Sequence, residues 1–228
     1  MPVKAIINAI VTIAWKDILS EFRSRETISS MLIFCLIVVV IFNFMFEPGS
    51  TQVRQMVPGI LWVAITFAGI LGLNRSFIYE VDQGCLLGLL LCPVDPYILY
   101  FGKMIGNFFF MVIMEIIIIP LMIVLFNLDI LNILLPLALI ILLGTLGFAA
   151  VGTLLSAISV NTRAREILLP VLLFPIAIPI LLAAVKATGA LIREGTIEAA
   201  SSWIKILAGF DIIFLIISSL LFEYVVED

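Results

Sequence analysis

Two acidic residues lie inside long apolar runs of this 228-residue chain, where a carboxyl group could do chemistry within a membrane. Glu115 falls near the middle of the run 102–126, and Asp211 lies in the run 203–226. An acid at mid-bilayer depth costs about 2.5–3.5 kcal/mol on insertion scales, so each should face protein or water. Two interpretations stay open. The acids line a substrate or gating path, or each is a neutral carboxylic acid bonded to a neighbouring helix.

Catalytic and metal chemistry have little support in the sequence. The chain has no histidine, which removes the usual proton shuttle and the commonest metal and haem ligand. Of its three cysteines, Cys35 lies in an apolar run, and Cys85 and Cys92 are too oddly spaced for a metal site. No GxxxxGK[ST], HExxH or CxxC motif occurs. We therefore expect a non-catalytic chain with no metal site and no tightly bound cofactor, energised by a partner or an ion gradient.

These side chains must be positioned by membrane helices. Hydrophobic residues make up 64% of the chain and charged residues 12%, which is too little polar surface for a soluble domain. A bilayer span needs about 20 mostly apolar residues. The sequence therefore predicts an all-α integral membrane protein, a single domain over 1–228, with six transmembrane helices at 28–46, 57–73, 102–126, 133–159, 167–185 and 203–226.

The first 27 residues have the pattern of an amphipathic helix lying in the membrane interface. One face of the stretch 11–22 is apolar: Val11, Trp15, Ile18, Leu19 and Phe22. The other face is polar: Lys16, Asp17, Ser20 and Glu21. A simple cytoplasmic tail is the alternative interpretation.

The distribution of Lys and Arg predicts that both termini are cytoplasmic. With the N-terminus inside, the inner segments hold eight basic residues: Lys4, Lys16, Arg23, Arg25, Arg75, Lys103, Arg163 and Arg165. The outer segments hold four: Arg54, Lys186, Arg193 and Lys205. The net charge of −4 and the scattered basic residues argue against nucleic acid as a partner.

Three connections carry charges or unusual length. The inner segment 74–101 combines Arg75, Glu80 and Asp82 with an apolar run before Pro93, so it can form a short helix that offers charged ends and an apolar ridge to a soluble partner. A plain interfacial loop is the alternative. A compact charged cytoplasmic loop contains Arg163, Arg165 and Glu166, and 186–202 is expected to be an extended extracytoplasmic loop.

Two blocks of the sequence resemble one family. The first includes Pro58-Gly59-Ile60-Leu61-Trp62, Leu73-Asn74-Arg75, Asp82-Gln83-Gly84 and Gly102-Lys103. The second includes Arg163-Ala164-Arg165-Glu166 with Pro170, Pro175 and Pro179. Both resemble the CcmB family, the haem-exporter permeases of the cytochrome c maturation system.

This resemblance implies an ABC-2-type permease of the inner membrane. Two copies would pair with two copies of the ATPase CcmA, which would bind the ATP, and further partners would be CcmC, the small protein CcmD and, indirectly, the periplasmic haem chaperone CcmE. Haem would be the cargo, or ATP would drive release of the haem-loaded chaperone. The residues implied in ATPase coupling are Arg75, Glu80 and Asp82 as polar contacts or anchors, Gly84, and Leu86, Leu89 and Leu90 as an apolar ridge.

Two other functions fit the same pattern. A generic ABC-2 exporter of a lipid, glycan or drug would use the inner segment in the same way, with Glu115 and Asp211 lining a polar path. A proton-coupled transporter would use Glu115 and work without any ATPase.

Overall fold

The computed structural model describes residues 3–47, 49–82, 84, 88, 94–160, 162 and 164–227. In these ranges the elements are helical: α1 (Val3–Ser24), α2 (Glu26–Met45), α3 (Thr51–Asp82), α5 (Pro96–Leu125), the 3-10 turn η1 (Leu131–Ile133), α6 (Leu134–Val160), α7 (Arg165–Glu194) and α8 (Ile197–Glu227). Every long helix except α1 is long and apolar enough to cross a membrane. The prediction of an all-α membrane protein with six spanning helices is confirmed.

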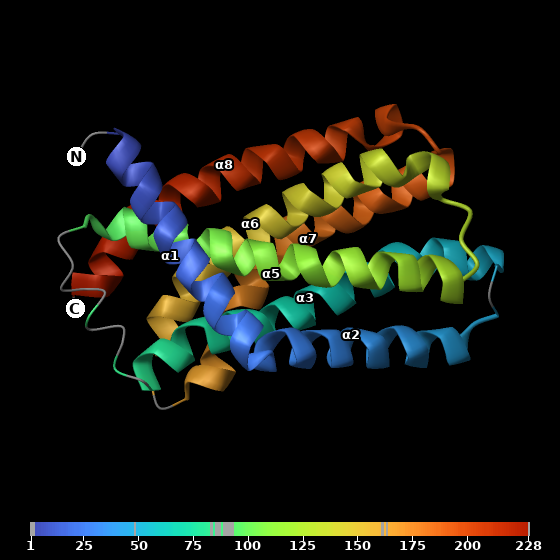
Figure 1. Cartoon of the computed structure of the whole chain (residues 1–228). Coiled ribbons are helices and arrows are strands. Elements are labelled where there is room, and N and C mark those ends of the chain that lie inside the picture. The colour runs from blue at the N-terminus through green and yellow to red at the C-terminus, as the bar shows by residue number, and fades with distance from the viewer. Residues whose placement is uncertain are drawn as a thin grey trace.

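The six spanning helices form one bundle with α6 in its interior (Figure 1). Helix α6 contacts α3, α5, α7 and α8, while α2 packs against α3 and α5. Helix α1 crosses α5 obliquely near one end of the bundle (Figure 1). Both chain termini, the end of α3 and the start of α5 lie at this end, which we call the terminal end (Figure 1).

Small residues on α6 allow its neighbours to approach closely, as is typical of helix packing in membranes. The indole ring of Trp62 from α3 lies against Gly144, at a place where any Cβ would collide with it. Its Nε1 donates a hydrogen bond to Thr188 Oγ1 of α7 at 3.1 Å. One aromatic side chain therefore joins three of the spanning helices in the core.

Two connections are shorter than the sequence suggested. Helix α3 continues to Asp82 and α5 begins at Pro96, so the connection within 74–101 is 83–95. The expectation of an extended loop over 186–202 is wrong, because α7 runs to Glu194 and α8 begins at Ile197. Burial of Ala187, Ala190 and Leu191 keeps this stretch helical. Gly195, with a φ of 71°, then ends α7 by donating its N–H to the Leu191 carbonyl at 2.9 Å.

The amphipathic helix predicted near the N-terminus is α1, and its apolar face points away from the protein. Val11, Trp15 and Phe22 are 57%, 61% and 50% exposed. The polar residue Asp17 instead turns toward α5, where its side chain is only 14% exposed. A helix that shows apolar side chains outward and is not itself a span suits the membrane interface.

The corner between α1 and α2 is fixed by polar contacts of the backbone. Arg25 adopts a left-handed conformation with a φ of 58°, which separates the two helices. The Glu21 carboxylate accepts hydrogen bonds from the N–H groups of Thr27 and Ile28 at 2.7 and 3.0 Å. Glu21 thereby satisfies two N–H groups at the start of α2 that have no partner within the helix.

Candidate functional site

At the terminal end, charged side chains near the C-terminal end of α3 form ion pairs with residues of several neighbouring helices. Arg75 pairs with Glu26 of α2 at 2.8 Å. Glu80 pairs with Lys16 of α1 and with Lys103 of α5. These contacts tie α3 to three other helices immediately before the connection 83–95.

The last residue of α3 makes a further contact to α7. The Arg165 guanidinium donates two hydrogen bonds to the Asp82 carboxylate, at 3.0 and 3.1 Å. Such two-bond pairs fix the geometry as well as the distance between their partners. The end of α3 and the start of α7 are therefore held in one relative position.

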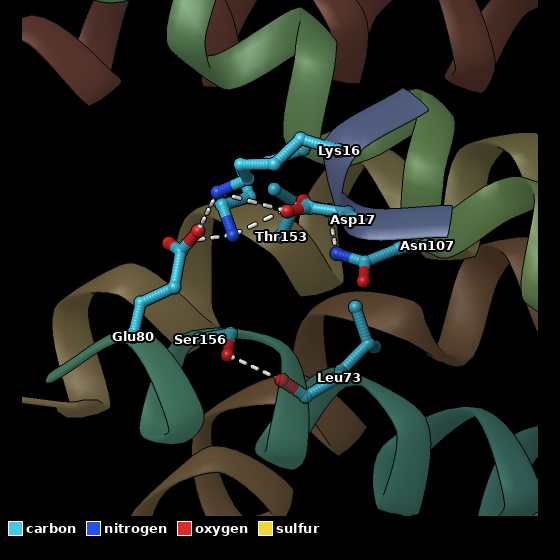
Figure 2. A network of polar contacts seen from close by, with 8 residues as sticks. Lys16, Asp17, Leu73, Glu80, Asn107, Thr153 and Ser156 are labelled. Carbon is cyan, nitrogen blue, oxygen red and sulfur yellow. Dashed lines mark hydrogen bonds and ion pairs between the residues drawn. The ribbon is translucent and has the colours of Figure 1, made fainter. Parts of the chain in front are cut away.

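Lys103 is the most deeply buried charge at the terminal end, with a side chain 1% exposed. Its Nζ lies 2.5 Å from a Glu80 oxygen and 3.1 Å from an Asp17 oxygen. It also lies 5.2 Å from the centre of the Phe77 ring, a cation–π arrangement. A buried ammonium needs such partners because it has lost its water. Figure 2 shows Lys16 and Asp17 of α1 converging with Glu80 of α3.

Lys16 completes this group at its more exposed side. Its Nζ pairs with Asp17 at 3.1 Å and with Glu80. Partial burial by itself lowers the pKa of Lys16, but the neighbouring Asp17 and Glu80 outweigh burial and the pKa is raised. Lys16 therefore keeps its positive charge at physiological pH.

Uncharged hydrogen bonds extend the polar network from the charged group into the bundle (Figure 2). Asn107 of α5 donates to Thr153 of α6 at 3.0 Å. Ser156 of α6 donates to the Leu73 carbonyl of α3 at 2.7 Å. The two helices that carry Lys103 and Glu80 are thus both fastened to α6.

The other residues predicted at the coupling segment have different surroundings. Gly84, with a φ of 67°, donates its N–H to the Val81 carbonyl at 3.0 Å and forms a turn directly after α3. Glu166 is exposed in the first turn of α7. Four predicted residues lie outside the described residues: Leu86, Leu89, Leu90 and Arg163.

Glu115 is buried and has a hydrogen-bond partner on the neighbouring helix. Only 2% of the residue is exposed, and its Oε1 accepts a hydrogen bond from Thr145 of α6. This arrangement matches the interpretation of an acid bonded to a neighbouring helix. Among the residues that the structure describes, no charged side chain forms an ion pair with Glu115.

Asp211 is buried against α6 in a different way. It is 3% exposed, and neither carboxyl oxygen has a hydrogen-bond partner among the residues that the structure describes. The carboxyl group occupies the space beside Gly147, where a Cβ would collide with Oδ1. Positions 145 and 147 are about 200° apart around a helix, so Glu115 and Asp211 approach opposite faces of α6 at nearly the same height.

Lys16, Asp17 and Lys103 were not among the site residues predicted from the sequence. A signal for Lys103 was present, because it lies inside the apolar stretch of α5 and a charge there requires a partner. Its partners could not be named from the sequence, since Asp17 and Glu80 come from helices far away along the chain. Among the described residues, no group of three or more Cys, Asp and Glu could hold a metal ion.

Comparison with known proteins identifies the family. The family model described as "CcmB protein" matches residues 8–227. "Heme exporter protein B" of Haemophilus influenzae is 27% identical over 167 residues, 73% of this chain and 75% of that protein. The proteins of the same name from Pseudomonas aeruginosa and Rhodobacter capsulatus are 27% and 29% identical, over 71% and 73% of this chain and 72% and 76% of their own lengths. The chain belongs to the CcmB family.

Proposed function

We propose that this chain is the membrane component of an ATP-driven complex for cytochrome c biogenesis, which exports haem or drives release of the haem-loaded periplasmic chaperone. The matched relatives carry the name "Heme exporter protein B", and the chain has six helices suited to cross a membrane. ATP hydrolysis belongs to a separate partner, a CcmA-like ATPase. A second copy of this chain, a CcmC-like haem-handling protein and a small CcmD-like protein complete the complex.

The ATPase binds at the terminal end, through the connection 83–95. The observation that carries this proposal is the anchoring of α3, whose last two turns pair with α1, α2, α5 and α7. A force applied to 83–95 would reach four other helices through these contacts. The excess of Lys and Arg at this end supports a cytoplasmic location for both termini in the inner membrane.

The close packing of the interior favours a mechanical role, in which the chain transmits ATP-driven movement, over passage of haem through a single copy of the chain. The pocket among apolar side chains such as Val57, Leu61 and Ile119 has a volume of only about 10 Å³. Binding sites for small molecules usually occupy about 300–1,000 Å³ and include a few placed polar groups. In this proposal ATP-driven closure of the motor tilts the helices and releases the loaded chaperone from its haem-handling partner.

Co-purification with the ATPase tests the placement of the coupling site. Asp82→Lys is expected to reduce the amount of ATPase recovered with the complex several-fold, because it reverses the charge where α3 enters 83–95. Glu194→Lys is a matched control, since Glu194 is as exposed as Asp82, at 52%, but lies at the opposite end of the bundle. Equal recovery of ATPase with both variants would contradict the terminal end as the ATPase site.

The biological role is tested by deleting the gene for this chain in its own organism. Loss of covalently haem-loaded c-type cytochromes, restored by the wild-type gene, is the expected result. Normal c-type cytochromes together with loss of a surface lipid or glycan would instead identify a general ABC-2 exporter. ATP-dependent haem flux in vesicles that hold only this chain and the ATPase would favour haem passage over the mechanical role.

A further inference from the structure

Four charged side chains at the terminal end form a closed ring of alternating sign. Lys16 pairs with Asp17 at 3.1 Å, Asp17 with Lys103 at 3.1 Å, Lys103 with Glu80 at 2.5 Å, and Glu80 again with Lys16. We call these four residues the charge ring. Each residue has two neighbours of opposite sign, and the formal charges sum to zero.

The charge ring joins three helices that are separate in the sequence. Helix α1 supplies Lys16 and Asp17, α3 supplies Glu80, and α5 supplies Lys103. Glu80 lies in the last turn of α3, which ends at Asp82. A displacement of the end of α3 therefore reaches Glu80 directly after the Asp82–Arg165 contact.

The four side chains of the charge ring are buried to different extents, and this decides which of their ion pairs can break. The side chain of Lys103 is 1% exposed and that of Glu80 is 6% exposed, whereas that of Lys16 is 43% exposed. A buried ion that loses its partner is strongly destabilised, but an exposed ammonium regains water when its pair breaks. Lys103 therefore stays paired with Asp17 and Glu80, whereas the ion pairs of Lys16 can break and reform.

Helix α1 packs against α5 through an apolar stripe, to which Ile6 and Ile10 contribute partly buried side chains. Its buried residues are Ile13 and Ala14, and Ile13 fits over Gly102, where an added Cβ would lie 2.7 Å from the Ile13 side chain. Most of its large apolar side chains point outward. The charge ring is the polar connection between α1 and the end of α3.

The geometry points to the charge ring as the joint through which ATP-driven movement of the end of α3 reaches the interfacial helix α1. Lys16, Asp17 and Lys103 are positioning residues in this joint, because they act through Glu80 and α3 and touch neither nucleotide nor cargo. When the motor closes, the end of α3 draws Glu80 inward, the contact from Lys16 follows, and α1 shifts along the membrane surface. This inference rests on the proposed function, since it requires an ATPase at the terminal end.

The test uses the complete complex in lipid nanodiscs, with three variants of this chain. Lys16→Gln removes the charge of the most exposed residue of the charge ring, and Lys16→Arg keeps that charge. Lys186→Gln is the control, because it removes an exposed lysine from the half of α7 that lies away from the terminal end. Three quantities are measured: ATPase recovered with the complex, ATP hydrolysed, and haem-loaded chaperone released per ATP. Lys16→Gln is expected to keep assembly and thermal stability but to lower release per ATP several-fold, with Lys16→Arg and Lys186→Gln close to wild type.

The outcomes separate a joint from a structural contact. Unchanged release per ATP in assembled Lys16→Gln would overturn the inference, because an intact coupling ratio means that the charge ring transmits nothing. A Lys16→Arg variant as impaired as Lys16→Gln would also overturn it, since the retained charge should restore the ring. If the wild-type chain recovers no ATPase at all, the proposed function fails, and the role of the ring fails with it.

Discussion

The carboxylate of Asp82, the last residue of α3, accepts two hydrogen bonds from Arg165, the first residue of α7. The pair joins the ends of two spanning helices that are 83 residues apart in sequence. It is accessible to solvent on the Asp82 side, which is 52% exposed. It is therefore both an anchor of α3 and a surface that a partner at the terminal end can reach.

An exchange of charges should rescue this isolated pair. Asp82→Arg alone places two guanidinium groups together and is expected to lower ATPase recovery and holocytochrome yield several-fold. Combining it with Arg165→Asp restores opposite charges and is expected to recover most of both. If ATPase recovery and holocytochrome yield of the double variant are as low as those of Asp82→Arg alone, the partner contacts the Asp82 side chain directly, and the α3–α7 contact is not what matters.

The same exchange should fail within the charge ring. In Lys16→Glu with Glu80→Lys, the new carboxylate at position 16 would face Asp17 and the new ammonium at position 80 would face Lys103. Two of the four contacts become repulsive, so the double variant is expected to accumulate poorly and to unfold at a lower temperature than wild type. Full rescue by this exchange would mean that Lys16 and Glu80 form a simple pair.

Removal of the buried ammonium should be costly for folding. Lys103→Ala leaves Asp17 and the buried Glu80 with only the partly exposed Lys16 as a counter-charge. Loss of one partner of a buried ion pair costs about 3–5 kcal/mol. Unfolding in mixed detergent micelles, followed by circular dichroism, measures this change. Lys205→Ala, at an exposed position on α8, is the control and is expected to stay near wild type.

Gly147 should be required because of the Asp211 carboxyl group. Gly147→Ala pushes a methyl group into Oδ1, and overpacking of this kind costs about 1–3 kcal/mol. Asp211→Gly in the same chain empties the space, so the added methyl group should then cost far less. A double variant in which Gly147→Ala remains as damaging as before would place the strain elsewhere, such as at Ile180.

Glu115 should tolerate loss of its ionisable group but not loss of its acceptor oxygen. Glu115→Gln keeps an oxygen for the Thr145 hydroxyl and is expected to retain stability and holocytochrome yield. Glu115→Leu leaves the buried hydroxyl without this acceptor, which costs about 1–3 kcal/mol. Loss of transport in a stable Glu115→Gln protein, with transport persisting in the absence of any ATPase, would instead establish proton coupling through Glu115.

Trp15 can report where α1 lies. Interfacial helices bury their apolar face about 5–10 Å into the boundary between headgroups and acyl chains, so lipids brominated near the headgroup should quench Trp15 fluorescence more than lipids brominated near the chain ends. The fluorescence of Trp15 is obtained as the difference in emission between the wild-type protein and Trp15→Phe. Equal emission of the two proteins in all brominated lipids would place the outward face of α1 against something other than lipid.

The sequence by itself determined the class of the protein and the number of its spanning helices. Length and apolarity are local properties of a segment, so six runs long enough for a bilayer were sufficient to predict six spans. The amphipathic pattern of 11–22 likewise predicted a helix before α2. The motif blocks were specific enough to indicate the CcmB family, which the family model over 8–227 confirms.

The tertiary structure decided which charges meet and which way α1 faces. Glu80 was predicted to be either a polar contact for a partner or an anchor; it is 4% exposed, because α1 and α5 close over it with Lys16 and Lys103. The stretch 186–202 looked polar enough for a loop but is helical except at Gly195 and Thr196, since burial of Ala187 and Leu191 against the bundle outweighs its local polarity. Burial and charge pairing depend on helices distant in sequence, so no local pattern could supply them.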